Sequence, residues 1–214
     1  TFRLDRNVDT KSKDIIEDVI SERFFELYWN SIYQHLSVFE SLDGLTKSAG
    51  VGVLGGAANL VTTGVGTNFQ YVQRTVAPSN TFDFTKESRF RTVIAADQIT
   101  AQNIQIHIGT SAGDSYGFDI EDDIIRGFST LSGTKTTVTL NKSIDDTNLF
   151  LLEAKYFPNN RVDFYVNSLL YGSSTTNLPK TNSTILWNCT ITEQAAVAKT
   201  MWLYSIEYLQ KQYG

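Results

Sequence analysis

The sequence predicts a mainly β protein in which two antiparallel sheets stack on each other, preceded by one amphipathic α-helix. Three observations support this. Apolar residues recur every four positions before about residue 36, apolar and polar residues alternate after it, and turn-forming segments interrupt the alternation at short intervals. The change of period predicts two parts, an N-terminal helical segment over residues 1–36 and a β-sandwich over residues 37–214.

Residues 12–35 are predicted to form the helix. Ile16, Ile20, Phe24 and Tyr28 recur every four residues and place one apolar stripe along it. A lone helix cannot leave a stripe so rich in aromatic residues exposed to water, so the stripe must be buried. Two partners remain open, the sandwich of the same chain and the same helix of a neighbouring chain. The segment would then be a stalk or docking element.

The remainder of the chain consists of short predicted strands. They lie at residues 37–41, 51–54, 58–62, 68–74, 81–84, 89–95, 103–109, 115–121, 124–129, 135–140, 148–156, 161–167, 169–174, 184–192 and 199–210. Strands of this length and spacing indicate a sandwich or barrel of antiparallel sheets. No alternation of strands and helices is visible, which disfavours a nucleotide-binding α/β fold.

The stretch "YFPNNRVDFYVNSLLYGSSTTNLP" at residues 156–179 shows the alternation most clearly. Its expected core-facing residues are Val162, Phe164 and Val166. Its expected outward-facing residues are Asp163, Tyr165 and Asn167. The "PNN" before this strand suits a turn, since proline fixes φ and asparagine tolerates the left-handed conformation.

The order of these segments resembles the concanavalin A-like (laminin-G-like) jelly-roll domain. The similar segments are "FESLDGLTKS", "FDFTKESRFRTVI", "IHIGTSAGDSYGFDIEDDIIRGFST", "LLEAKYFPNNRVDFYVNSLLYGSSTTNLP" and "KTMWLYSIEYLQKQ". The late motif of that family is matched by Ala154, Tyr156, Pro158, Val162, Phe164, Tyr165, Val166, Asn167, Thr176, Leu178 and Pro179. The family usually has Gly after this Asn. The chain has Ser168, which leaves room for a turn of a different type.

The resemblance implies a two-sheet sandwich with one concave face, which family members often use for glycans. Similar modules occur on phage tail fibres, viral spikes and capsid-surface appendages. The expectation is therefore a non-enzymatic structural or attachment protein on the surface of a virus or phage particle, outside the cell. Its expected partners are other virion proteins or further copies of itself in a homo-oligomer, together with host-surface glycans. The alternatives are a secreted carbohydrate-binding (lectin-like) module or a glycoside hydrolase of the same fold.

Candidate glycan-binding residues follow from the chemistry of sugar recognition, which places a planar aromatic ring beside amide and carboxylate groups. The candidates are Asp163, Tyr165, Asn167 and Trp187. They would form one patch if the outward side of residues 161–167 belongs to the concave face. The competing interpretation makes Trp187 a core anchor between the sheets and Tyr165 part of a half-buried cross-strand pair.

The glycosidase alternative requires two carboxylates across a sugar-binding cleft. The segment "GFDIEDDI" offers Asp119, Glu121 and Asp123 at alternate positions, but it differs from the E-x-D-x-x-E or E-x-D-x-E pattern expected in hydrolases of this fold. A polar hairpin tip explains the same acids more simply, so no catalytic residue is predicted. These acids, together with Asp114 and the pair Asp145 and Asp146, also suggest a Ca²⁺ site if carbonyl groups complete it.

Composition excludes several other classes of function. The formal net charge is -5 and Lys and Arg are not clustered, which argues against nucleic-acid binding. The longest uncharged apolar stretch, residues 49–61, is too short to span a bilayer. A single cysteine, Cys189, excludes an intrachain disulfide, and with two histidines no metal site is predicted; Ca²⁺ alone stays open as a cofactor.

Overall fold

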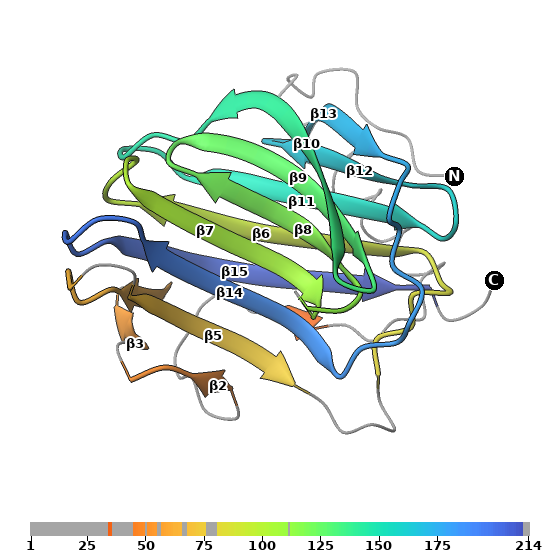
Figure 1. Cartoon of the computed structure of the whole chain (residues 1–214), viewed down its shortest axis with the longest axis horizontal. Helices are drawn as coiled ribbons and strands as arrows, with labels where there is room; N and C mark the ends of the chain where they lie inside the picture. Colours follow the sequence, from red (N-terminus) through yellow and green to blue (C-terminus); the bar gives the residue numbers. More distant parts are fainter. Residues whose placement is uncertain are drawn as a thin grey trace, which may run out of the picture.

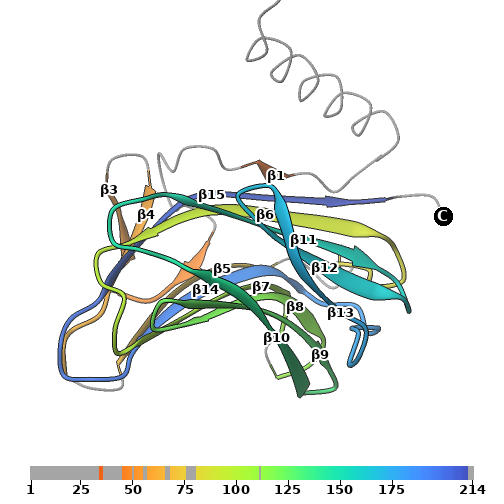
Figure 2. The same ribbon diagram turned by 90° about the horizontal axis from the view of Figure 1, so that it is seen from above.

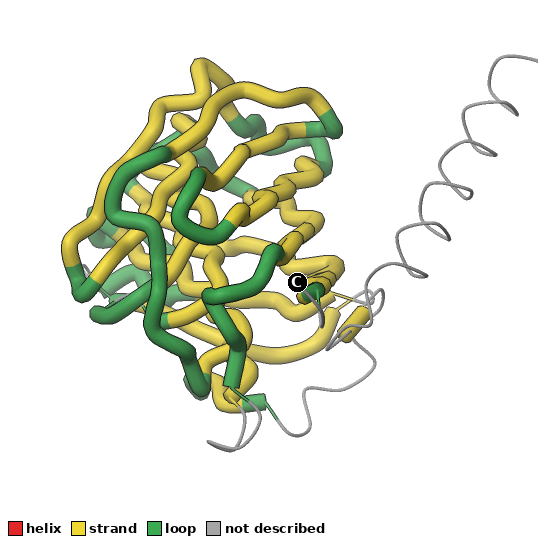
Figure 3. The backbone as a smooth tube through the Cα atoms, turned by 90° about the vertical axis from the view of Figure 1, so that its right-hand side faces the viewer, coloured by secondary structure: helices red, strands yellow, loops and turns green. Residues whose placement is uncertain are grey.

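The computed structural model describes residues 34–35, 45–49, 51–54, 57–65, 68–75, 81–110 and 112–211. Within these ranges the chain consists of strands and loops, as Figure 3 shows. The strands form two antiparallel sheets that stack face to face (Figures 1 and 2). The predicted two-sheet antiparallel sandwich is therefore confirmed.

Sheet A contains eight of the described strands in the order β13-β12-β11-β6-β15-β4-β3, with β1 paired to β15 beside this path. Its strands are β1 (Gln34–His35), β3 (Val51–Leu54), β4 (Ala57–Val61), β6 (Ser88–Ala96), β11 (Phe150–Phe157), β12 (Arg161–Val166), β13 (Leu169–Ser174) and β15 (Thr200–Gln210).

Sheet B contains seven of the described strands in the order β10-β9-β8-β7-β14-β5-β2. Its strands are β2 (Thr46–Lys47), β5 (Phe69–Thr75), β7 (Gln102–Gly109), β8 (Ser115–Glu121), β9 (Ile124–Leu131), β10 (Thr134–Ser143) and β14 (Ile185–Glu193). This sheet is curved, and its hollow side faces away from sheet A (Figure 2).

Most predicted strands have bounds within three residues of the observed ones, and those at 51–54, 115–121 and 169–174 have the observed bounds. The strand predicted at 81–84 is wrong, since there Phe82 forms only an isolated bridge with Ser183. The Gln210 side chain explains this: its Oε1 accepts from the Asp83 N–H and its Nε2 donates to the Asp83 carbonyl. The strand predicted at 37–41 lies outside the described residues.

The helix predicted over 12–35 also lies outside the described residues, apart from its last two positions. Gln34 and His35 form β1 and pair with Tyr208 and Glu207 of β15. The helical prediction is therefore wrong at these two residues, because a polar pair at the end of the stripe lies beside a long strand and extends the sheet.

The core lies between the two sheets and is built by alternation. Along β6, the even-numbered residues are buried and the odd-numbered residues are half-buried over all nine positions. The predicted core residues Val162, Phe164 and Val166 of β12 are all buried. The sheets approach closely at Gly127 of β9, where an ideal Cβ would lie 2.3 Å from Cγ of the Phe164 ring. Only a residue without a side chain fits there.

The turn between β12 and β13 consists of Asn167 and Ser168. Their φ values are 49° and 68°, so both central residues of a two-residue hairpin loop are left-handed, as in a type I′ turn. The amide N–H of Asn167 donates to the Leu151 carbonyl, and its Oδ1 accepts from the Leu151 N–H. Ser168 thus adopts the conformation in which glycine is favoured.

Candidate functional site

The outer face of sheet B is the hollow side of the sandwich and has the strongest concentration of polar and aromatic side chains suited to a ligand. Because Ile104, Ile106 and Phe118 point into the core, their neighbours along each strand point outward. We define the outer face of sheet B as the outward residues of β5, β14, β7, β8, β9 and β10.

The cross-strand register arranges these residues into three rows. The first row is Gln73, Asn188, His107, Gly117, Phe128 and Thr137. The second row is Tyr71, Thr190, Gln105, Asp119, Arg126 and Thr139. The third row is Phe69, Thr192, Asn103, Glu121, Ile124 and Ser143. Amides and hydroxyls dominate these rows.

An aromatic pair lies at the β5 side of this face. Phe69 and Tyr71 are two residues apart on one strand, so they share a face, and their rings stack with centroids 6.2 Å apart. Phe69 is 55% exposed and Tyr71 is half-buried. Their neighbours across the strand pair are Thr192 and Thr190, which place hydroxyl groups beside the two rings.

His107 occupies the middle of the first row and is fully buried. Asn188 Nδ2 donates to His107 Nε2 at 3.2 Å and to Thr190 Oγ1 at 2.9 Å. Burial lowers the pKa of His107 to about 4, because the charged ring would lose its hydration. The imidazole is therefore neutral near pH 7, in keeping with Nε2 acting as an acceptor.

The aromatic ring at the other side of the face is covered. Phe128 contacts the His107 ring edge-on, with centroids 5.8 Å apart, and Lys135 Nζ lies 4.3 Å above its centroid. Gly117 lies between His107 and Phe128 in the same row, and an ideal Cβ there would lie 2.2 Å from the Ile106 carbonyl oxygen. The position between the two rings therefore excludes any side chain.

Two acids of the predicted trio lie on this face. Asp119 and Glu121 project from β8, whereas Asp123 lies in the turn between β8 and β9. Asp119 accepts hydrogen bonds from Asn103 Nδ2 at 2.7 Å and Lys135 Nζ at 2.6 Å, and Glu121 pairs with Arg126. The carboxylates of Asp119 and Glu121 are thus ion-paired, and Asp123 is part of the turn.

The structure does not bring the four predicted glycan-binding residues together. Trp187 is fully buried and belongs to the core cluster, as the competing interpretation expected, because it alternates with the outward Asn188 on β14. The other three lie on the outer side of sheet A, opposite the hollow face. Asp163 is only 5% exposed there, because Arg161 Nε and Ser173 Oγ hold its carboxylate.

The remaining two candidates have local partners. The Lys155 Nζ lies 4.4 Å above the Tyr165 ring centroid, and Tyr165 is half-buried. Asn167 is exposed and shapes the hairpin turn described above. The premise that their side of the strand belongs to the concave face is not met, so they cannot share a patch with the rows of sheet B.

No family model matches the chain, and no curated protein matches it. Solved structures do. The carbohydrate recognition domain of Emp47p has 8% identity and a TM-score of 0.61, covering 83% of this chain and 95% of that one. The Crh5 transglycosylase in complex with NAG has 12% identity and a TM-score of 0.65, covering 86% of each chain. A Bacillus licheniformis β-glucanase has 13% identity and a TM-score of 0.62, covering 86% and 98%.

The fold is a concanavalin A-like jelly roll. The resemblance inferred from the sequence is thereby confirmed at the level of architecture. Within the concanavalin A-like fold, the structural relatives include both carbohydrate-binding and carbohydrate-processing proteins, and identities this low show the fold alone.

The carboxylates considered for calcium have protein donors instead. The oxygens of Asp114 accept from the backbone N–H groups of Ser132, Lys180 and Thr181, which joins three connections at one end of the sandwich. These hydrogen bonds hold the pKa of Asp114 below its usual value despite partial burial, which acts in the opposite direction. A cavity of about 320 Å³ lies there, lined by residues that include Thr110, Asp114 and Asn182.

Asp145 is similarly engaged within its own loop. It accepts from the N–H and hydroxyl of Thr147 and from the backbone and side chain of Asn148. Within the described ranges no group of three or more His, Cys, Asp and Glu residues is placed to hold a metal ion.

No helix among the described residues is both long and apolar enough to cross a bilayer.

Sequence reasoning missed the outer face of sheet B, although one signal was present. The segment "FQYVQ" alternates, so Phe69, Tyr71 and Gln73 share one side of a predicted strand. The alternation groups residues by side, but it does not say which sheet is hollow or which strands are neighbours. That assignment depends on pairings between distant segments, such as Tyr71 with Thr190.

Proposed function

We propose that this protein is a non-enzymatic, lectin-like carbohydrate-binding module whose ligand lies on the outer face of sheet B. The observation that carries the proposal is the stacked pair of Phe69 and Tyr71 beside rows of amides and hydroxyls. Sugars have apolar C–H faces that stack on aromatic rings and hydroxyl edges that exchange hydrogen bonds with such groups. The three structural relatives support the proposal through their shared fold.

The hydrogen bonds and ion pairs of the acidic residues support the non-enzymatic part of the proposal. Glycoside hydrolysis uses two carboxylates, one of which must donate a proton to the leaving oxygen. Asp119 is bonded by Asn103 and Lys135, and Glu121 by Arg126. The first position of an E-x-D-x-E arrangement centred on Asp119 is Gly117, where the Ile106 carbonyl oxygen leaves no room for a side chain.

A matched pair of variants tests the proposed face. Tyr71→Ala removes the ring next to the hydroxyl rows, and Tyr165→Ala removes another half-buried ring, from the outer side of sheet A. A glycan array on the unmodified chain first identifies a bound oligosaccharide, whose Kd is then measured by calorimetry. We expect Tyr71→Ala to weaken binding by roughly tenfold, or about 1.4 kcal/mol, while Tyr165→Ala leaves it unchanged.

Two results would contradict the proposal. The first is an array without signal, both with and without added calcium. The second is a loss of affinity in Tyr165→Ala with none in Tyr71→Ala, which would place the ligand on the outer side of sheet A.

A glycoside hydrolase is the second candidate, because Asp119 and Glu121 project from the same face of β8 at a spacing of two residues. Hydrolysis of a polysaccharide by the unmodified chain that disappears in Glu121→Gln would favour it. The expected result under our proposal is no hydrolysis in either protein.

The sequence resemblance alone supports placing this module on the surface of a virus or phage particle as an oligomeric attachment protein. None of the three structural relatives is named as part of a particle. A clean monomer in light scattering at high protein concentration would contradict the self-association in this part of the proposal.

A further inference from the structure

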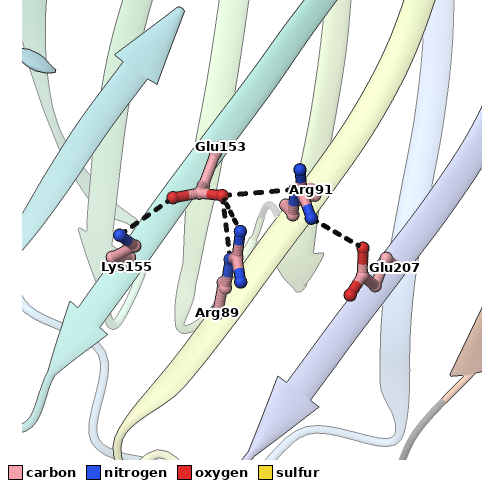
Figure 4. Close-up of polar contacts among 5 residues, drawn as sticks. All are labelled: Arg89, Arg91, Glu153, Lys155 and Glu207. Atoms are coloured by element: carbon pink, nitrogen blue, oxygen red, sulfur yellow. Dashed lines mark hydrogen bonds and ion pairs between the residues drawn. The ribbon is translucent and has the colours of Figure 1, made fainter. Parts of the chain in front are cut away.

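The outward side of sheet A has a network of charged groups across β6, β11 and β15. Glu153 lies at its centre and contacts Arg89 Nη2 at 2.5 Å, Lys155 Nζ at 3.1 Å and Arg91 Nε at 3.2 Å (Figure 4). Arg91 Nη1 continues the network to Glu207 at 3.5 Å. The five residues comprise three cations and two carboxylates, a formal charge of +1.

Apolar side chains lie on the same side of the sheet. Leu209 points outward, because Tyr208 before it belongs to the core cluster, yet Leu209 is only 4% exposed. Val93 and Leu151 are cross-strand partners on this side, and both are half-buried. A sheet face with a buried leucine and half-buried aliphatic neighbours is typical of a face that a further layer covers.

The N-terminal part of the chain arrives at this side of the molecule. In β1, His35 pairs with Glu207, a member of the charged network, and Gln34 pairs with Tyr208. The sequence predicts an amphipathic helix over residues 12–35, of which residues 12–33 precede β1, with an apolar stripe that includes Ile20 and Phe24. This segment has five acidic and two basic residues, a formal charge of −3 that is complementary to the network.

We propose that the outer face of sheet A is the docking surface for residues 12–33 of the same chain. The apolar stripe of the segment packs against Val93 and Leu151, and its acidic residues face the cations of the network. The occupant comes from the same chain because β1 tethers the segment at the edge of the face. A tether of this kind gives an effective concentration of the order of millimolar, which a second copy must exceed to compete.

Photo-crosslinking in the full chain tests this placement. Leu151 is replaced by photoreactive benzoylphenylalanine in one protein, and Thr139, exposed on the outer face of sheet B, is replaced in the control. Each protein is irradiated as an equal mixture of unlabelled and isotope-labelled chains, and the joined peptides are identified by mass spectrometry. We expect cross-links from position 151 to residues 12–33 within one chain, and none to that segment from position 139.

A pair of second substitutions separates specific docking from chance proximity. Ile20→Asp introduces a charge into the apolar stripe and is expected to reduce the intrachain cross-link several-fold, whereas Ser21→Asp, outside the stripe, leaves it. Cross-linked peptides that join labelled to unlabelled chains in the proportion expected for random pairing would assign the face to a second copy and overturn the proposal. The absence of any cross-link from position 151 to the segment would also overturn it.

Discussion

His107 is a basic side chain on the outer side of a sheet, yet it is fully buried between its neighbours. Phe128 contacts its ring edge-on, Asn188 donates to Nε2, and a Cβ at Gly117 would lie 2.7 Å from the His107 Cβ. The charged groups nearest to it are Lys135 and Asp119, which act on its pKa in opposite directions. Burial is the largest influence and favours the neutral ring.

This burial predicts a specific dependence of stability on pH. An unfolded histidine takes up its proton near pH 6.5, whereas folded His107 resists protonation until about pH 4. Between these values the unfolded state binds more protons, so the free energy of unfolding falls as the pH falls, by up to about 1.4 kcal/mol per pH unit. Urea denaturation from pH 7.5 to 4.5 measures this slope.

The control for this prediction is His107→Gln, which keeps a polar side chain but cannot titrate. We expect its slope between pH 6.5 and 4.5 to be shallower than that of the unmodified chain. Equal slopes in the two proteins would show that another group titrates in this range.

At the scale of the element, the β12–β13 hairpin combines a favourable pattern with an unfavourable residue. Its strands alternate as the sequence predicts, and its turn has the handedness that a two-residue hairpin prefers. Ser168 nevertheless adopts a φ of 68°, which costs a residue with a Cβ more than it costs glycine.

Ser168→Gly is therefore expected to stabilise the protein, by about 0.5–1 kcal/mol, because it relieves the left-handed strain while the turn keeps its type. The matched control is Ser143→Gly at the end of β10, an extended position where glycine is expected to be neutral or destabilising. Chemical denaturation at equilibrium gives both values. A destabilised Ser168→Gly protein would mean that the Ser168 side chain contributes contacts that outweigh the strain.

The sequence was most informative about the positions of individual strands and turns. Period-two alternation and turn residues located the strands, because both are local properties of the chain. The segment at 81–84 shows the limit of this approach: the pattern suits a strand, but the amide of Gln210 takes the backbone groups of Asp83. Residue 210 is far away in sequence, and no local signal announces that contact.

The candidate site was harder to predict from the sequence for the same physical reason, namely its dependence on contacts between distant segments. The sequence correctly placed Asp163 and Tyr165 on one side of a strand, whereas Asn167 belongs to the turn that follows it, and the sequence correctly raised the possibility of a core role for Trp187. Which side of which sheet is hollow depends on the curvature and stacking of both sheets, which arise from pairings between strands distant in sequence.

At the scale of the whole molecule, the spacing of the two sheets is limited by what lies between them. Gly127 of β9 faces the Phe164 ring of β12, and an ideal Cβ would lie 2.3 Å from that ring. Any side chain at this position must push the ring or separate the sheets, and a packed core resists both.

We therefore expect Gly127→Ala to lower the free energy of unfolding by roughly 1–3 kcal/mol. Gly52→Ala is the control, because an ideal Cβ at Gly52 has no neighbouring heavy atom within 4 Å. Thermal or urea unfolding distinguishes the two. Equal stability of both variants would indicate that the Phe164 ring moves aside without cost.

The stacking of the two sheets also gives the molecule two opposite outer sides (Figure 2), and the side chains on these two sides differ in chemistry. A protein immobilised on a sensor chip through the Lys155 side would direct Tyr71 and its row away from the chip. The reverse orientation, through Lys135, would press that row against the support. Comparing analyte capture in the two orientations would reveal which side of the sandwich is functional before any ligand has been identified.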